Sequence, residues 1–254
     1  MDKELLCLMR RHIPKRYHHY CNELYSQLLC LQLNMKSCYL FDLFPFNMTQ
    51  LRQLIIELGE KSYLNFESIL LNYSINDICI LNLSSIDKLI DSARLLIDLT
   101  TMTTYYNNEH PVFDELKQHL LWINSIYKTK VLDFFDPSQN DEWSDIISKL
   151  NHTTVFGYLL KYPIIFYYSS FPNLDNLPLN NYRISVDIDN KHISNKNLLL
   201  YSFSYPNHAN IDERKVKKFV DNWSEQLLAI TSLKNVIKHI DIKCELNKMS
   251  VWCL

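Results

Sequence analysis

Apolar runs of strand length and amphipathic stretches follow one another along the first half of the chain. The runs at 38–43 and 78–83 are apolar at nearly every position, which is typical of strands buried on both faces. Apolar residues at helical spacing follow each run, over 48–58 and 86–97. Strands that are each followed by a helix predict parallel N-terminal strands. Gly59 is predicted to end the first of these helices as its C-terminal glycine.

Strict alternation of polar and apolar residues takes over in the second half. Residues 182–189, 199–205 and 240–246 alternate with a period of two, which predicts strands with one wet face, usually antiparallel. Apolar residues at helical spacing predict a helix over 210–227. The two halves together predict an α/β fold: a single domain over residues 1–254 with a mixed sheet, parallel N-terminal strands, antiparallel C-terminal strands and helices on both faces.

Glycine is scarce in this sequence, and its scarcity excludes several classes of enzyme. Average usage predicts about 18 glycines in a chain of this length, and the sequence has two, Gly59 and Gly157. A Rossmann fingerprint, a Walker loop and a nucleophile elbow each need at least two closely spaced glycines. Dinucleotide enzymes, P-loop ATPases and typical α/β-hydrolases are therefore excluded, and the sequence predicts no cofactor.

Composition and charge point to no special partner. The net charge is -2, so no electrostatic argument favours nucleic acid or an anionic membrane. The first residues lack the pattern of a signal peptide, and no apolar run reaches the roughly 18 residues of a transmembrane helix. The seven cysteines include no C-x-x-C pair, which excludes a zinc knuckle and a thioredoxin-type motif. We expect a soluble protein of the reducing interior of the cell, either cytoplasmic or nuclear.

A basic cluster lies near the N-terminus. Arg10, Arg11, Lys15 and Arg16 stand ahead of the stretch 17–33, whose apolar spacing predicts a helix. The cluster is either a surface for nucleic acid or a partner, or the solvated entry of that helix. The solvated entry is favoured, because runs of charge are usually solvated faces.

Candidate site residues follow the two N-terminal apolar runs, because ligands of parallel sheets bind beyond the carboxyl ends of the strands. Asp42 lies at the end of the first run, where it would act as a base or metal ligand. Asn82 lies at the end of the second run and Ser84 and Ser85 follow it, where Ser84 or the helix N-terminus would take an anion. Alternatively, Asp42 accepts hydrogen bonds from the turn at 44–47 and Ser84 caps a helix. The alternative is favoured, because turn and cap roles are commoner than catalysis.

Two residues outside these runs complete the candidate set. His152 is the one histidine that we would test as an acid or base. Tyr162 would line a pocket, although aromatic residues at strand spacing more often belong to the core. No paired His-x-x-x-His motif occurs, so no metal site is predicted. The candidate catalytic residues are Asp42, Ser84 and His152, and the candidate binding residues are Asn82, Ser85 and Tyr162.

Several motifs stand in a recognisable order and spacing. They are Trp143, 154–157, Tyr162-Pro163, 199–204 and Trp223, together with the strand ends 39–42 and 80–85. They resemble an uncharacterised animal protein family with a human member, catalogued as a domain of unknown function, and the resemblance covers most of the chain. The sequence departs from the family at Asn82, where we expect an acid, and this weakens an acid/base or metal role there. The resemblance implies a shared fold and an intracellular setting, and no reaction.

Two classes of function fit these observations. The protein is either a non-catalytic binding or adaptor domain whose exposed aromatic surface engages another protein, or a small hydrolase or transferase. The enzyme would act on an anionic small molecule in a pocket centred on Asp42. The binding domain is favoured, because no recognised nucleophile, base and orienting group converge. An enclosed site with Asp42 and a perturbed partner would support the enzyme, and a closed sheet end with an exposed apolar patch would support binding.

Overall fold

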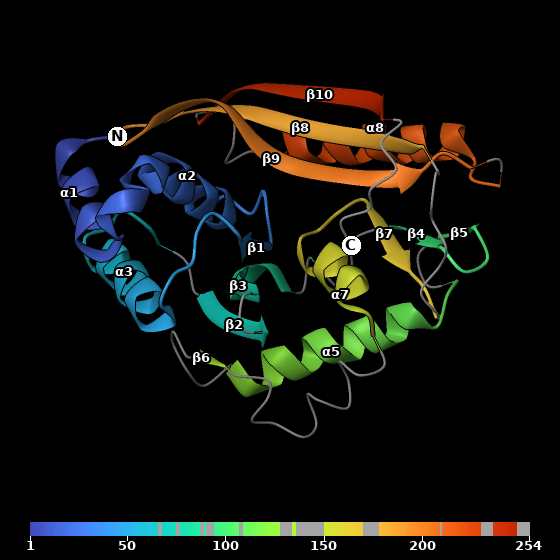
Figure 1. The fold of residues 1–254 in the computed structure, drawn as a ribbon, viewed down its shortest axis with the longest axis horizontal. Coiled ribbons are helices and arrows are strands. Elements are labelled where there is room, and N and C mark those ends of the chain that lie inside the picture. The colour runs from blue at the N-terminus through green and yellow to red at the C-terminus, as the bar shows by residue number, and fades with distance from the viewer. Residues whose placement is uncertain are drawn as a thin grey trace.

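The structure of this chain is a computed structural model. It describes residues 1–65, 68–74, 77–86, 89, 94–106, 109–127, 134–135, 150–169, 178–208, 210–229 and 236–247. Within these ranges helices and strands are mixed along the chain (Figure 1), which confirms the predicted mixed α/β class.

Helices from the first 60 residues gather at one end of the molecule (Figure 1). They are α1 (Lys3–His12), the 3-10 helix η1 (Lys15–Tyr20), α2 (Cys21–Gln32) and α3 (Met48–Glu60). Together η1 and α2 confirm the helix predicted over 17–33. Nine of the 12 residues of α2 are buried, so this helix has almost no solvent face and lies inside the molecule rather than on its surface.

Strands form three sheets in the described residues. The first contains, in spatial order, β1 (Cys38–Phe41), β3 (Asp77–Asn82), β2 (Ser68–Ser74) and β6 (Phe134–Phe135). The second contains β5 (Thr103–Tyr106), β4 (Leu95–Asp98) and β7 (Ile164–Tyr167). The third contains β10 (Ile237–Asn247), β8 (Leu179–Asp189) and β9 (Ser194–Pro206). The remaining described helices are η2 (Leu83–Ser85), α5 (Val112–Tyr127), α7 (His152–Leu159) and α8 (Glu213–Ala229).

The direction of the strands agrees with the prediction in the third sheet and differs in the first. All pairs of the third sheet are antiparallel, as predicted. However, β1 pairs with β3 antiparallel, with Cys38 opposite Leu81, so the predicted parallel pairing of these strands is wrong. The reason is β2, which precedes β3 in the chain and pairs antiparallel with it. Helix α3 therefore connects β1 to β2, which run in the same direction on either side of β3.

A second correction concerns the end of the stretch 86–97, for which the spacing predicts a helix: Ile86 and Leu89 are helical, but the residues from Leu95 onward form a strand. Leu96 and Ile97 lie in β4, which pairs in parallel with β7. Leu96 packs into one hydrophobic cluster and Ile97 into the other. A strand buried on both faces needs apolar residues at neighbouring positions, and this short pattern is indistinguishable from that of a buried helix.

Two hydrophobic clusters form the core, and the strands of the first sheet separate them. Tyr39 and Phe41 of β1 belong to the larger cluster, whereas Cys38 belongs to the smaller one. In β3, Ile80 and Leu81 divide in the same way. Successive side chains of a strand point to opposite faces, so these strands are buried on both sides although they pair antiparallel.

The third sheet has one face packed and one face open. Trp223 of α8 packs against Tyr201 of β9, with ring centroids 5.0 Å apart, and α8 lies behind the sheet in the view of Figure 1. On the other face Arg183 and Ser202 are exposed, as the alternation in the sequence predicted. This sheet therefore follows the ordinary pattern of an antiparallel sheet at a surface.

Helix α2 closes one edge of the third sheet. Gln27 Nε2 donates a hydrogen bond to the backbone oxygen of Leu199 in β9, at 3.1 Å. The hydroxyl of Tyr201 donates to the backbone oxygen of Met35, just after α2, at 2.6 Å. These bonds join segments more than 160 residues apart in the chain.

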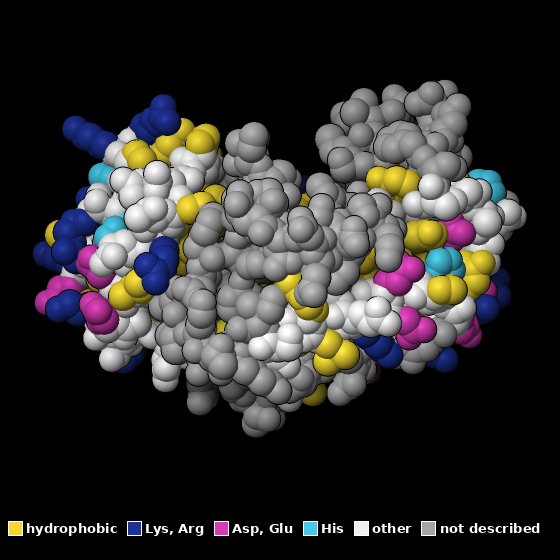
Figure 2. Space-filling view, turned by 90° about the horizontal axis from the view of Figure 1, so that it is seen from below, with side chains coloured by type: hydrophobic (Ala, Val, Ile, Leu, Met, Phe, Trp, Pro, Cys, Tyr) yellow, Lys and Arg dark blue, Asp and Glu magenta, His cyan; other side chains and the backbone are white. Residues whose placement is uncertain are grey.

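The basic cluster near the N-terminus lies at the end of α1 and in η1. Arg11 Nη2 is 2.9 Å from Glu57 Oε2, and the guanidinium of Arg16 lies 4.5 Å from the ring centroid of Tyr17. Basic side chains in the last turn of α1 also suit the helix dipole. Cationic and anionic side chains are interspersed at this end of the molecule (Figure 2). These contacts favour a solvated helix end over a binding surface.

The end of α3 differs from the prediction at Gly59. Gly59 lies inside the helix, does not have a positive φ, and would place a β-carbon with no atom within 4 Å. The helix ends at Lys61, and the residue in the left-handed region is Ser62, with φ of 58°. The glycine therefore has no conformational role at the helix end.

We expect Gly59→Ala to raise the free energy of unfolding by about 0.5–1 kcal/mol, because alanine loses less backbone entropy than glycine in an exposed helix interior. Ser62→Gly should stabilise the chain by roughly 1 kcal/mol through relief of the left-handed backbone. Urea denaturation measures both. A destabilised Gly59→Ala variant would show that the glycine is needed where it stands.

Candidate functional site

The two groups of predicted site residues lie at opposite ends of an antiparallel strand pair. The backbone N–H of Asn82 donates to the oxygen of Ser37 at 2.8 Å, so Asn82 lies beside the start of β1. Asp42 comes five residues after Ser37, beyond the other end of β1, which corresponds to roughly 16 Å of extended chain. Ser84 and Ser85 follow Asn82 in η2. The structure thus brings three of the four residues together and leaves Asp42 apart.

The side chain of Asn82 is fully buried and makes four hydrogen bonds. Its Nδ2 donates to the backbone oxygen of Leu31 at 2.8 Å and to Asn34 Oδ1 at 3.3 Å. Its Oδ1 accepts from the backbone N–H of Ser84 at 3.1 Å and from the Ser84 hydroxyl at 2.8 Å. Two donors and two acceptor sites are all that an amide offers. Asn82 therefore caps η2 and holds it against the end of α2.

The two serines serve the same turn. The Ser84 hydroxyl donates to the amide oxygen of Asn82, and the buried Ser85 hydroxyl donates to the Asn82 backbone oxygen at 2.7 Å. An activated serine nucleophile would donate to a base such as histidine, and neither hydroxyl does so. Asp42 lies apart and is exposed. The residue that caps η2 is thus Asn82, whereas Ser84, the cap suggested by the sequence, donates to it from inside the helix.

Tyr162 and His152 lie in and after α7. The Tyr162 ring packs 5.8 Å from the ring centroid of Tyr201 and 5.7 Å from that of Phe203. Burial, aided by the negative charge of Asp42, raises the pKa of Tyr162 to about 12. Tyr162 is thus a core residue between the second and third sheets. His152 is the first residue of α7, and its side chain lies outside the described part of the structure.

A buried lysine, absent from the predicted set, lies near these residues. Lys36 is 7% exposed, and its Nζ donates to Gln27 Oε1 at 2.8 Å. This oxygen is the one hydrogen-bond acceptor that the described residues offer to Nζ. The ammonium also lies 5.4 Å from the ring centroid of Tyr201 and 5.6 Å from that of Tyr39. Two aromatic rings and one amide therefore replace the water around this cation.

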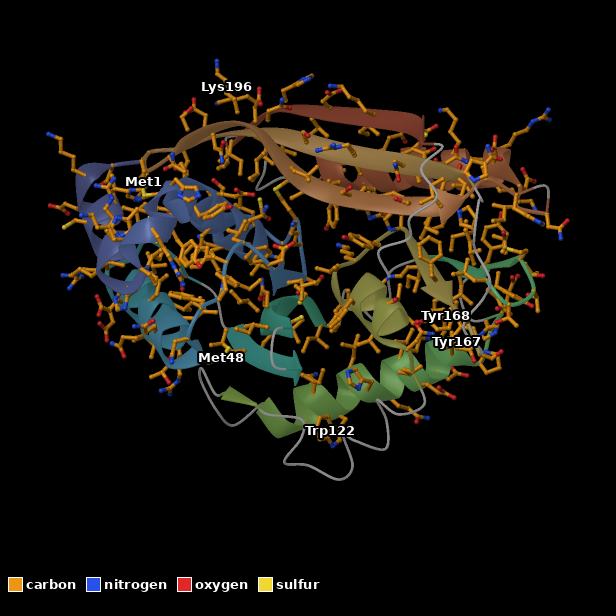
Figure 3. All side chains as sticks on the ribbon, in the orientation of Figure 1. Met1, Met48, Trp122, Tyr167, Tyr168 and Lys196 are labelled. Atoms are coloured by element: carbon orange, nitrogen blue, oxygen red, sulfur yellow. The ribbon has the colours of Figure 1, made fainter. Side chains whose placement is uncertain are left out.

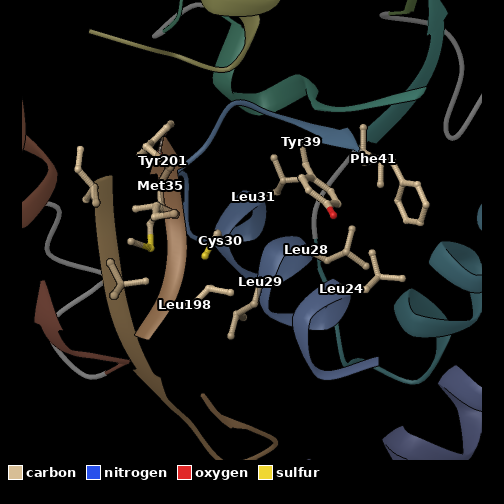
Figure 4. Packing of buried hydrophobic residues seen from close by; sticks show 14 of the residues in the cluster. Leu24, Leu28, Leu29, Cys30, Leu31, Met35, Tyr39, Phe41, Leu198 and Tyr201 are labelled. Atoms are coloured by element: carbon tan, nitrogen blue, oxygen red, sulfur yellow. Dashed lines mark hydrogen bonds between the residues drawn. The ribbon is translucent and has the colours of Figure 1, made fainter. Parts of the chain in front are cut away.

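Burial changes the acid–base properties of this neighbourhood. It lowers the pKa of Lys36, and the negative charge of Asp42 opposes that effect. It raises the pKa of the Cys30 thiol to about 12, against the positive charge of Lys36. The buried hydroxyl of Tyr39 has no hydrogen-bond partner among the described residues, and Figure 4 shows Tyr39 among the leucines of α2. A lysine with a lowered pKa can act as a nucleophile or base.

Arg94 is a second cation in the interior. It is 1% exposed, and its guanidinium donates to the backbone oxygens of Tyr158 at 2.8 Å and Leu89 at 3.0 Å. Its Cζ lies 3.9 Å from the Tyr158 ring centroid, and burial lowers its pKa to about 10. Backbone carbonyls and an aromatic face stabilise this guanidinium, so it joins α7 to β4 as a structural residue.

The sequence pattern around Lys36 indicates that this residue is buried or lies at a strand edge. Lys36 stands at the start of the otherwise largely apolar run 35–41, where a lysine is expected to be buried or to mark the strand edge. Arg94 precedes β4, which was predicted as helix, so its burial could not be inferred.

Within the described ranges, no group of three or more His, Cys, Asp and Glu side chains could hold a metal ion. None of the described helices combines the length and apolarity that crossing a membrane requires.

Comparison with known families provides one match. Residues 6–254 match the family described as Domain of unknown function (DUF4504). The chain belongs to this family. The match confirms the resemblance to a domain of unknown function that the motifs carried, and it leaves the animal origin untested. Neither the curated proteins nor the solved structures include a match to the chain. The function of this DUF4504 domain must therefore be argued from its own residues.

We expect Asn82→Asp to lower the free energy of unfolding by about 3 kcal/mol or more, because a buried carboxylate would face the Leu31 oxygen without the two amide donors. Ser84→Ala is the control. It removes one bond at an exposed position and should cost less than about 1 kcal/mol. Urea denaturation at neutral pH compares the two variants. Equal losses would contradict the central role of the Asn82 amide.

The pKa of Lys36 makes a separate prediction. Burial lowers the pKa of Lys36 in the folded chain, so the unfolded chain binds this proton more tightly. The contribution of Lys36 to the free energy of unfolding therefore rises with pH, up to the ordinary lysine pKa of 10.5. The stability of Lys36→Met relative to the wild type should therefore fall as pH increases from about 7 to about 10. Lys196→Met, at a position that projects from the surface in Figure 3, is the matched control. A constant difference for Lys36→Met would refute the lowered pKa.

Proposed function

We propose that this chain is a non-catalytic binding domain that engages another polypeptide along β10, the edge strand of its third sheet. The observation that carries the proposal is the exposure of Ile242 in the middle of this strand. Ile242 lies directly opposite Ile184 of β8. Ile184 is fully buried, whereas Ile242 is 38% exposed. The row of apolar side chains that includes Ile184 thus continues onto the edge strand, where Ile242 is exposed to solvent.

An edge strand with an apolar row suits the binding of an extended polypeptide. The unpaired backbone groups of the edge provide hydrogen bonds, and the side chains of alternate residues provide specificity. Cys244, two residues after Ile242 on the same face, is also exposed. The sequence analysis expected an exposed aromatic surface to engage the partner, and this proposal assigns that role to the apolar row that contains Ile242.

The environment of the candidate catalytic residues supports binding over catalysis. Asn82 and both serines use their polar groups in the η2 cap, and Asp42 lies at the opposite end of the strand pair. No nucleophile and base face one another among the described candidates. The exposed apolar row on β10 adds to the support for a binding domain.

The proposal treats residues 1–254 as a single domain in the cytoplasm or nucleus, without cofactor or nucleic acid. The larger hydrophobic cluster supports the single domain, because it includes residues from Leu5 to Leu227. The net charge of -2 supports a protein partner over nucleic acid. A reducing compartment is supported by the free thiols of Cys7 and Cys244, both exposed.

We expect Ile242→Lys to abolish the capture of partner polypeptides by the tagged chain from cell extract, because a lysine interrupts the apolar row at the edge. Leu121→Lys is the matched control, since Leu121 is 54% exposed on α5, away from the third sheet. Asp42→Ala should also retain the partners. Circular dichroism and thermal unfolding check that each variant is folded. Equal capture by the two lysine variants would exclude β10 as the contact surface.

The second candidate is a small hydrolase or transferase that acts on an anionic small molecule. The specific observation in its favour is the buried ammonium of Lys36, whose lowered pKa and single hydrogen-bond acceptor suit the binding or activation of an anion. Metabolite screening of the wild type against Asp42→Ala and Lys36→Met tests it. Turnover that disappears in these variants, with unchanged partner capture, would replace the binding proposal by the enzyme.

A further inference from the structure

The two edges of the third sheet are built differently. Along β9, Gln27 donates to the Leu199 oxygen at 3.1 Å, and Asn195 Nδ2 donates to Ser26 Oγ at 3.0 Å. Side chains of α2 therefore cover that edge. At the other edge, β10 has β8 as its only strand neighbour among the described residues. Figure 1 shows β10 along the upper boundary of the molecule, with no labelled element beyond it.

The side chains of β10 divide between the two faces of the sheet. Ile240, Ile242 and Cys244 lie opposite buried residues of β8 and continue its apolar row. Asp241 and Lys243 alternate with them and point to the open face. The Lys243 ammonium is 3.1 Å from Asp241 Oδ2, and the two side chains are 61% and 37% exposed, respectively. The strand thus carries opposite charges on either side of Ile242.

We propose that β10 pairs with β10 of a second copy of this chain, antiparallel, about a two-fold axis that passes through Ile242. The proposal rests on the proposed function, and it names the partner. An axis perpendicular to the sheet keeps the apolar rows of both copies on one face. It sets Ile242 against its own counterpart and joins two three-stranded sheets into one of six strands.

The charges of β10 favour this register over its two neighbours. With the axis at Ile242, Asp241 faces Lys243 of the second copy, and the reverse pair forms by symmetry. Directly opposite residues of two paired strands point to the same face of the sheet, so the two-fold axis must pass through a residue of β10. Each alternative register therefore places the axis at another residue of the strand. An axis at Asp241 would set two aspartates opposite one another, and an axis at Lys243 two lysines. Like charges directly opposite destabilise a strand pair, so neither neighbouring register competes.

Backbone pairing and one apolar row make a small interface, below the roughly 1,000 Å² expected of a stable complex. We therefore expect dissociation constants on the order of micromolar. The second copy would also shield the exposed edge, which natural proteins rarely leave open to pairing with unrelated chains.

Charge exchange tests both the dimer and its register. Sedimentation equilibrium should show a concentration-dependent dimer for the wild type. Asp241→Lys and Lys243→Asp, each alone, should raise Kd about tenfold or more, because each places two like-charge pairs across the axis. An equimolar mixture of the two variants should dimerise again, because every cross-pair then joins opposite charges. A folding defect in either variant could not produce this recovery.

Cysteine cross-linking provides a second measurement. In a Cys7→Ser, Cys244→Ser background, Ile242→Cys should form an interchain disulfide under mild oxidation, because opposite residues of an antiparallel pair lie within disulfide range. Leu121→Cys, at another exposed apolar position, should remain reduced.

A wild-type chain that stays monomeric to high micromolar concentration would overturn the dimer. If Ile242→Lys still abolished capture of other proteins, the proposed function would survive with a different partner. A dimer that the mixture fails to restore would overturn the register.

Discussion

The burial of α2 is the constraint on which the rest of the structure depends. This helix lies between the first and third sheets, and its polar groups serve both. The Leu31 oxygen at its end accepts a hydrogen bond from Asn82 after β3. Gln27, from its middle, donates to Leu199 in β9. A helix surrounded by protein must find partners for every polar side chain it carries, and these two bonds fix the position of each sheet against it.

Lys36 extends the same arrangement. The Lys36 ammonium donates a hydrogen bond to the side-chain oxygen of Gln27, and the side-chain nitrogen of Gln27 donates to Leu199 in β9. The interaction takes a charge out of water, and the rings of Tyr39 and Tyr201 are weak substitutes for hydration. Burying an ammonium without a carboxylate is costly, which is why its pKa falls. The network therefore confers specificity of packing more than stability, since it can be satisfied in only one arrangement of helix and sheet.

Much of the fold follows from the hydrophobic pattern, and the errors have identifiable causes. Long elements with a clear period were predicted well, including β8, β9 and α8. The direction of β1 relative to β3 was mistaken, because β2 lies between α3 and β3 and forms an antiparallel hairpin with β3, which reverses the direction of the chain. The end of the stretch 86–97, which lies in β4, was mistaken because burial on both faces removes the alternation that identifies a strand. Among site residues, the sequence placed a helix cap at Ser84, and the structure places it two residues earlier at Asn82, whose bond to Leu31 could not be predicted. That bond depends on tertiary placement.

The separation in sequence between α2 and β9 has a consequence for biosynthesis. The partner strand of α2 is made some 160 residues after the helix, so the apolar surface of α2 stays uncovered while most of the chain leaves the ribosome. Contacts of such long range slow folding and favour intermediates that expose apolar surface. We therefore expect a truncated chain that lacks β9 to expose the part of α2 that faces the third sheet.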